Sequence, residues 1–360
     1  MVIKLLRKAV PGTILFFLIA SLVLTGYSQE KTTVKIQLAG SLLVPFGAIE
    51  ETFEAENPDI DVLIEGHGSI QVIRHVIELP AFSGEPIADI VAVADYSLIS
   101  KLMYKTMIPE SEKPYANWCI QFGTNSLGLA YTSQSKYADE INKDNWYQIL
   151  SREDVKVGIS DPRFDACGYR ALMAMKLAEI FYDEADILPD ITGRFSYPIK
   201  VEEDSNGCTI LIPEILEAER LAIRDSSIKL LFPIMSGDLD YAFEYKSVAR
   251  QHGVNFLEFP DEINLSSDSY KTLCENMKVK LAFKRFASVN PDYYILPIIY
   301  GITIPDNAPH PQEAVRLVEF ILSPSGQEIM KQTLQVTINP PVVDISKNLP
   351  RQLLDITIQK

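Results

Sequence analysis

The sequence reads Ser160-Asp161-Pro162-Arg163-Phe164-Asp165-Ala166-Cys167-Gly168-Tyr169-Arg170 between a strand-like apolar run, residues 155–159, and a helix-forming run, residues 171–181. At such a turn the free N–H groups and the dipole of the helix start favour an anion or a metal–oxygen centre. Asp165 places one carboxylate there. Taken alone, Asp165 is equally consistent with a simple helix cap, because acidic residues are common at that position. Whether Asp165 is a cap or part of a ligand site therefore depends on the neighbouring segments.

Similar strand–turn–helix units occur three times in succession near the N-terminus. Consecutive units predict a parallel sheet with helices on its faces. In such sheets ligands bind at the carboxyl ends of the strands. Two turns at those ends carry a Gly-Ser pair, Gly40-Ser41 and Gly68-Ser69, so we expect both serines at one rim. The expected strands are residues 34–38, 61–65 and 87–94, and the expected helices are residues 45–56, 70–79 and 97–104.

A second set of units follows, and it predicts a second lobe. The polar stretch 183–207 is expected to be an irregular surface insertion. The chain is therefore predicted to form two α/β lobes that it crosses between more than once, with lobe 1 built from residues 33–120 plus 255–345 and lobe 2 from residues 121–254. The further expected strands are residues 127–131, 155–159, 239–245 and 295–304, and the further expected helices are residues 146–151, 171–181, 226–235 and 311–322.

The first 28 residues predict a signal peptide or an N-terminal membrane anchor. Lys4, Arg7 and Lys8 precede an apolar core at residues 14–24, which is typical of export signals. That core is shorter than the roughly 20 residues that span a bilayer comfortably. Tyr27 stands where a lipoprotein would carry its lipidated cysteine. We therefore expect an extracytoplasmic protein at the outer face of the cell membrane.

Composition excludes several classes of function. The formal net charge of −15 argues against a nucleic-acid partner, and any bound anion has to be held by local dipoles rather than by a basic surface. The four histidines have no metal-ligand spacing, and no cofactor is expected. The four cysteines include no C-x-x-C pair, so disulfides are possible but their pairing cannot be assigned. The cysteines are Cys119, Cys167, Cys208 and Cys274.

Catalytic motifs are missing from the sequence. It contains no G-x-S-x-G, P-loop or H-E-x-x-H motif and no glycine-rich dinucleotide fingerprint after its first strand. Cys167 beside a helix start is a remote candidate nucleophile, but no histidine is adjacent in sequence. The sequence therefore predicts a binding protein and not an enzyme.

Several stretches together resemble the archaeal-type molybdate/tungstate-binding proteins of ABC importers, and the resemblance runs from about Val34 to Pro341. It implies a type II periplasmic-binding-protein fold, with a ligand cleft between two lobes. It also implies capture of molybdate or tungstate and delivery to a membrane permease with its ATPase. The stretches are Ala39-Gly40-Ser41-Leu42, Gly68-Ser69, AVADYSL (92–98), YADEINKDNW (137–146), CGYR (167–170), SGDLDYAFEYKSVARQHG (236–253) and YGITIP (300–305).

In that family, serine hydroxyls and backbone amides hold the oxyanion, and two carboxylates add oxygen ligands to its metal. Carried over by position, the resemblance implies Asp165 as the first carboxylate. The implied oxyanion contacts are Ser41, Ser69 and Tyr245, together with the backbone amides around Cys167 and Gly168.

This chain departs from the family pattern at two positions. Ala166 replaces a proline in the motif D-P-C-G-Y-R, which leaves the carboxylate in place. Ser227 falls where the second carboxylate, a glutamate, is expected, although Asp225 is only two residues away. The Ser227 hydroxyl is instead expected to donate to the oxyanion, which favours an undistorted tetrahedral anion. We therefore expect weaker six-fold coordination of molybdate or tungstate, or a preference for another tetrahedral oxyanion such as sulfate or phosphate. A membrane-tethered sensor that has lost transport is the remaining alternative.

Overall fold

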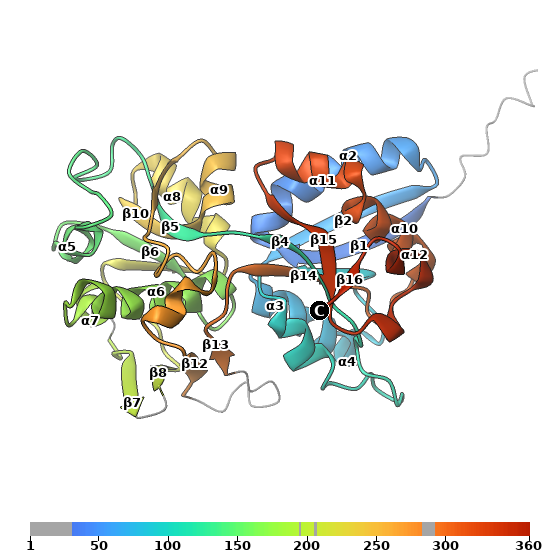
Figure 1. Ribbon diagram of the computed structural model, residues 1–360, viewed down its shortest axis with the longest axis horizontal. Helices are drawn as coiled ribbons and strands as arrows, with labels where there is room; N and C mark the ends of the chain where they lie inside the picture. The colour runs from blue at the N-terminus through green and yellow to red at the C-terminus, as the bar shows by residue number, and fades with distance from the viewer. Residues whose placement is uncertain (1–30, 194–195, 205–206, 283–291) are drawn as a thin grey trace, which may run out of the picture.

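The computed structural model describes residues 31–193, 196–204, 207–282 and 292–360, which form two α/β lobes side by side (Figure 1). The two-lobed α/β prediction is confirmed. The predicted signal peptide or anchor, residues 1–28, lies outside the described residues. In the part of the chain that is described, no helix has the length and apolar character to cross a membrane.

Lobe 1 is built on a mixed seven-stranded sheet. Strand β1 pairs in parallel with both β2 and β3, as the three N-terminal units predicted. Strand β14 then runs antiparallel between β3 and β4. In spatial order the strands are β16 (Ile358–Gln359), β15 (Val336–Val343), β4 (Ile120–Thr124), β14 (Ile299–Thr303), β3 (Ile90–Val93), β1 (Thr32–Ala39) and β2 (Ile60–His67).

Helices cover this sheet, and the N-terminal helices lie close to their predicted positions. The expected helix at 97–104 is an exception, because the chain there forms only a π-helical turn, η2 (Ile99–Met103), in which the Tyr104 amide bonds back to the Ile99 carbonyl. The helices of lobe 1 are α2 (Leu43–Glu56), α3 (Ser69–Glu78), α4 (Pro80–Ser83), α10 (Pro311–Leu322), α11 (Pro324–Gln332) and α12 (Arg351–Leu354).

Lobe 2 packs one long helix, α6 (Ala166–Tyr182), against two sheets. The first ten residues of α6 are all buried, which is the property of a helix that is enclosed rather than lying on a surface. The five-stranded sheet runs β11 (Asn255–Glu258), β5 (Leu127–Tyr131), β10 (Tyr241–Tyr245), β6 (Val157–Ser160) and β9 (Leu221–Arg224). The four-stranded sheet runs β13 (Tyr293–Tyr294), β12 (Met277–Leu281), β8 (Gly207–Ile212) and β7 (Lys200–Asp204).

The remaining helices of lobe 2 lie around these sheets. They are α5 (Trp146–Ser151), α7 (Ile187–Thr192), α8 (Leu231–Ser236) and α9 (Lys246–Gln251). The prediction that residues 183–207 form an irregular insertion is wrong for two of its segments. Helix α7 lies within that stretch, and β7 pairs antiparallel with β8.

The predicted lobe boundaries are also wrong at both crossings. Strand β4 still belongs to the sheet of lobe 1, so the chain first crosses at Asn125-Ser126 rather than after residue 120. Strand β11 pairs antiparallel with β5 in lobe 2, and β12 and β13 follow it there. The chain therefore returns to lobe 1 after Tyr294 and not at residue 255. Figure 1 shows β4 and β5 as one path between the lobes.

The two lobes meet where α3 begins. The amides of Ile70 and Gln71 both donate to the Phe164 carbonyl of lobe 2, at 3.0 and 3.1 Å. Lobe 2 thus satisfies N–H groups that the first turn of α3 cannot satisfy within its own helix. A Cβ on Gly68 would stand 2.4 Å from the Phe164 carbonyl oxygen and 2.5 Å from that of Asp225. Only glycine allows this approach of two backbones, so the lobes are closed on each other.

We predict that Gly68→Ala opens the two lobes. The new methyl group would collide with backbone atoms of lobe 2, which cannot rotate away as a side chain can. Small-angle X-ray scattering should show a larger radius of gyration for the variant than for the wild type. The matched control is Gly47→Ala within α2, where a Cβ meets nothing within 4 Å. It should leave the scattering unchanged and stabilise the protein by about 0.5–1 kcal/mol. Identical scattering from Gly68→Ala would contradict the closed geometry.

Candidate functional site

Asp165 lies between two helix starts, one from each lobe. It occupies the N-cap position of α6 and is only 5% exposed. Its Oδ1 accepts the amide of Ser69 in lobe 1 at 3.4 Å, and its Oδ2 accepts the amide of Ser227 in lobe 2 at 3.0 Å. Burial raises the pKa of this carboxyl, and the Ser227 amide opposes that rise. Asp165 is thus both a residue at a helix start and part of the contact between the lobes.

Helix α6 begins five residues earlier than the sequence predicted, at Ala166 rather than Ala171. The Cys167-Gly168 pair therefore lies in the first turn of α6, whose amides have no carbonyl one turn earlier to bind. A Cβ on Gly168 would stand 2.3 Å from the Ser160 carbonyl oxygen. This close packing of the helix start against the end of β6 requires glycine at that position.

Ser41 and Ser69 lie at one rim of the lobe 1 sheet, as predicted. The strands that precede them pair in register, Ala39 opposite His67. Ser41 Oγ accepts the Tyr300 hydroxyl at 3.0 Å, and Ser69 Oγ accepts the Ala94 amide at 3.0 Å. Because both oxygens act as acceptors in these bonds, each hydroxyl keeps its own hydrogen for a further partner.

Ser227 binds a carboxylate that sequence reasoning missed. Its hydroxyl donates to Glu244 Oε1 at 2.9 Å, and the Tyr245 amide donates to the same oxygen at 2.7 Å. Glu244 is fully buried, and its Oε2 has no hydrogen-bond partner among the described residues. Burial raises the pKa of Glu244 to about 8. The signal was present in the sequence, because a glutamate inside the otherwise apolar and aromatic strand β10 is unusual.

A buried ion pair supports the Tyr245 side of the site. Arg170 Nη1 donates to the Tyr245 hydroxyl and to the Ala94 carbonyl, each at 2.8 Å. Its Nη2 lies 3.7 Å from Asp95 Oδ2, which also accepts the Tyr169 hydroxyl at 2.5 Å. Buried charges are tolerated when they are paired and hydrogen-bonded in this way. The positive charge of Arg170 is therefore already balanced by Asp95.

Two alternatives from the sequence are not supported by the geometry. The Cys167 thiol donates to the Phe243 carbonyl at 3.6 Å, and burial raises its pKa well above the usual range, which is the opposite of what a nucleophilic cysteine needs. The Asp225 side chain lies on the surface 2.7 Å from Lys229 Nζ, so it does not replace the expected second carboxylate. All four cysteines are free thiols.

The arrangement is chemically suited to a compact anion. Ser41 and Ser69 offer hydroxyl donors from lobe 1, and the first turn of α6 offers backbone amides from lobe 2. The described residues contain no group of three His, Cys, Asp or Glu side chains that could hold a metal ion. The site is thus a set of neutral donors around Asp165 and Glu244.

Comparison with known proteins identifies the family. A family model described as bacterial extracellular solute-binding protein matches residues 34–333. The chain belongs to this family of solute-binding proteins. One relative is the molybdate/tungstate-binding protein WtpA of Pyrococcus abyssi, 36% identical over 342 residues, which cover 91% of each chain. An uncharacterized solute-binding protein of Methanoculleus marisnigri is 38% identical over 317 residues, covering 88% of this chain and 83% of the relative.

Solved structures support the fold of this solute-binding protein. The periplasmic molybdate-binding protein of Azotobacter vinelandii matches with a TM-score of 0.52 at 14% identity, covering 84% of this chain and 98% of the other. The sulfate-binding protein SubI of Mycobacterium tuberculosis matches with a TM-score of 0.52 at 14% identity, covering 86% and 88%. These structures confirm the type II two-lobed fold. The family model and the Pyrococcus relative confirm the predicted resemblance and the class of protein, which is a solute-binding protein rather than an enzyme.

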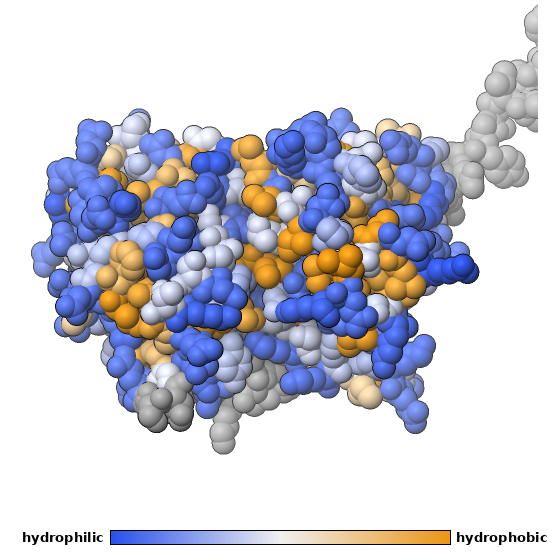
Figure 2. All heavy atoms as spheres, viewed as in Figure 1, coloured by the Kyte–Doolittle hydropathy of each residue, from blue (hydrophilic) through white to orange (hydrophobic). Residues whose placement is uncertain are grey.

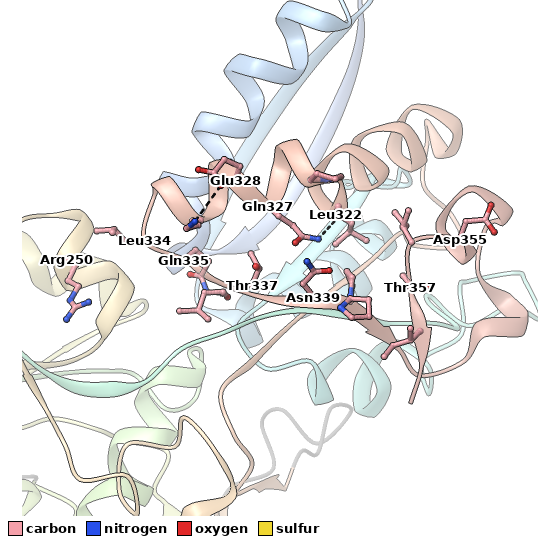
Figure 3. A pocket seen from close by; sticks show the side chains of 17 residues that line it. Arg250, Leu322, Gln327, Glu328, Leu334, Gln335, Thr337, Asn339, Asp355 and Thr357 are labelled. Carbon is pink, nitrogen blue, oxygen red and sulfur yellow. Dashed lines mark hydrogen bonds and ion pairs between the residues drawn. The ribbon is translucent and has the colours of Figure 1, made fainter.

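A groove elsewhere on this solute-binding protein is separate from the site. It measures about 930 Å³ and runs along α11, β15 and β16 of lobe 1, with Arg250 of α9 at one end (Figure 3). None of the site residues above lines it. Figure 2 shows hydrophilic side chains over most of the same face of the molecule, with apolar residues gathered near β15.

We predict that Glu244 makes the protein less stable as pH rises. The glutamate pKa is about 4.3 in an unfolded chain and about 8 in the folded protein. Between these values the folded state holds the extra proton, so the free energy of unfolding falls as pH increases through this window. The slope is at most about 1.4 kcal/mol per pH unit. Glu244→Gln should remove this contribution.

Urea unfolding between pH 5 and pH 8 measures the effect. The wild type should lose stability relative to Glu244→Gln as pH rises, and the two proteins should diverge throughout this range. Parallel curves for the two proteins would show that Glu244 does not hold a proton at neutral pH.

Proposed function

We propose that this solute-binding protein captures molybdate or tungstate outside the cytoplasmic membrane and delivers it to the permease of an ABC importer, which its ATPase drives. The supporting observation is that the Gly-Ser turns of lobe 1 and the Asp165 turn of lobe 2 come together at one place. The sequence relationship to a molybdate/tungstate-binding protein points to the same ligand. Export through residues 1–28 belongs to this proposal.

Closure of the lobes explains how a neutral set of donors holds a charged ligand. Ser41 and Ser69 come from lobe 1, whereas the amides of Cys167 and Gly168 and the hydroxyl of Tyr245 come from lobe 2. Ser227 is not one of these donors, because its amide donates to Asp165 and its hydroxyl to Glu244. An anion bound between them removes water from itself and from the donors, which strengthens each hydrogen bond. Opening the hinge at the crossing strands would release it, a motion that is common in binding proteins of this type. The closed surface is what we expect the permease to recognise.

The alternative ligand is another tetrahedral oxyanion, sulfate or phosphate. The reason for this alternative is Ser227, which stands where a carboxylate is expected. The side chain of Ser227 cannot supply an anionic oxygen to a metal, and its hydroxyl hydrogen is directed to Glu244. A site with hydroxyl and amide donors suits an undistorted tetrahedral anion. We therefore expect molybdate or tungstate to bind with four close oxygens.

Isothermal titration calorimetry of the purified, dialysed protein with molybdate, tungstate, sulfate and phosphate tests the function. We expect one-to-one binding of molybdate and tungstate that is at least about tenfold tighter than binding of sulfate or phosphate, or about 1.4 kcal/mol. Tighter sulfate binding would establish the alternative ligand. No heat with any of the four anions would contradict transport of these oxyanions and favour a sensor that has lost it.

Asp165→Ala should weaken molybdate binding by about 10- to 100-fold. The substitution removes the acceptor of two amides that join the lobes, and hydrogen bonds to a charged group are individually worth about 1.5–3 kcal/mol. Calorimetry measures the change. Asp225→Ala is the matched control, because it removes a carboxylate that is paired on the surface with Lys229. If Asp165→Ala binds as tightly as Asp225→Ala, the Asp165 carboxylate plays no part in ligand binding.

A further inference from the structure

Glu244 is a buried carboxyl group with one oxygen used and one oxygen free. Oε1 accepts the Ser227 hydroxyl and the Tyr245 amide, whereas Oε2 has no hydrogen-bond partner among the described residues. The side chain is fully buried. An unpartnered buried carboxyl oxygen is costly, and its position therefore requires an explanation.

The surroundings of Glu244 are the residues of the candidate site. Its two hydrogen-bond donors, Ser227 and Tyr245, are both residues that the sequence placed around the oxyanion. Ser227 also donates its amide to Asp165. The titratable groups that interact with Glu244 electrostatically include Asp165 and Cys167, at the start of α6, and Tyr300, in β14. Tyr300 in turn donates to Ser41.

Charge balance decides the protonation of Glu244. The buried cation Arg170, which donates to the Tyr245 hydroxyl, is paired with Asp95, so it does not neutralise a further anion. Asp165 accepts an amide on each oxygen, from Ser69 and from Ser227, and such bonds favour the charged form of a carboxyl. With a dianion beside it the buried site would already hold three negative charges, and an ionised Glu244 would make a fourth. Like charges that are buried together force one group to keep its proton. Burial itself raises the pKa of Glu244 in the same direction.

We propose that Glu244 contacts the bound oxyanion directly, as a neutral carboxylic acid whose Oε2 donates a hydrogen bond to one anion oxygen. This inference rests on the proposed function, because it needs an oxyanion in the cleft. Oε1 stays with Ser227 and Tyr245 and fixes the orientation of the group. The position that Ser227 leaves without a carboxylate is thus backed by a carboxyl group from β10, which acts as a donor and not as a metal ligand.

Two substitutions separate a donor from a metal ligand. Glu244→Gln keeps the shape and presents an N–H donor, so molybdate affinity should stay within about threefold of the wild type. Glu244→Ala removes the donor, and affinity should fall about 10- to 100-fold, as expected for a hydrogen bond to a charged group. Glu54→Gln is the matched control, because Glu54 also accepts a backbone amide, that of Val62 at 2.7 Å, but lies in α2 away from the site.

The pH dependence of molybdate binding to the wild type is a further test. Its molybdate affinity should fall as pH rises from 7 to 9, because the ionised form of Glu244 loses the donor and repels the anion, while the affinity of Glu244→Gln should change less. If Glu244→Ala binds molybdate as tightly as the wild type does, the inference is overturned and the proposed function still stands. A large loss in Glu244→Gln together with rising wild-type affinity at high pH would also overturn it, since an ionised metal ligand behaves in that way.

Infrared difference spectroscopy keeps the inference testable if Glu244→Ala does not fold. The wild type should show a carboxylic acid C=O band at neutral pH that Glu244→Gln lacks, and tungstate should shift this band. A band that does not move on tungstate binding would overturn the contact. Calorimetry that finds no binding of any oxyanion to the wild type would refute the proposed function first, and the inference with it.

Discussion

The contact on which the closed structure depends is the capping of α3 by the opposite lobe. A helix start leaves its first N–H groups without partners, and here the amides of Ser69, Ile70 and Gln71 are satisfied by Asp165 and by the Phe164 carbonyl. These acceptors belong to the turn that precedes α6. One lobe therefore completes the hydrogen bonding of a helix in the other lobe, and closing the cleft satisfies groups that opening would return to water.

The electrostatics of the site follow from this contact. A protein with a net charge of −15 cannot attract an anion through a general positive field, so its binding site has to supply local donors. The buried cation Arg170 is used internally, where it pairs with Asp95 and orients Tyr245. Two carboxyl groups, Asp165 and Glu244, lie beside the donors instead. Asp165 is held by the first amides of α3 and of the short helix that begins at Ser227, and Glu244 is held by Ser227 and Tyr245. Because their partners differ, Asp165 joins the two lobes, whereas Glu244 is proposed to donate a hydrogen bond to the anion.

The sequence was sufficient for the parts of the fold that repeat a simple pattern. Alternating and apolar runs located β1, β2 and β10, and the paired Gly-Ser turns located one rim of the site. The lobe boundaries were missed because strand pairing is not a local property, and nothing near residue 255 indicates that β11 bonds to β5. The start of α6 was missed for a related reason, since the glycine in its first turn argues locally for a loop, whereas packing against β6 requires it.

Glu244 is a site residue that could not be predicted from the sequence alone. The departure at Ser227 was visible in the sequence, and it predicted the loss of a carboxylate. The strand position of Glu244 was visible as well, but only the fold brings β10 beside the short helix that begins at Ser227. A site residue that is distant in sequence from the motif it serves can be recognised only when both elements are placed in space.

A crystal structure of the protein with tungstate tests this account most directly, because tungsten scatters anomalously and its position is found without reference to the protein. We predict one strong peak in the cleft, with anion oxygens within hydrogen-bond distance of Ser41 Oγ, Ser69 Oγ and Glu244 Oε2, and with four close oxygens on the metal. A peak outside the cleft, or a six-oxygen shell completed by Glu244, would contradict it.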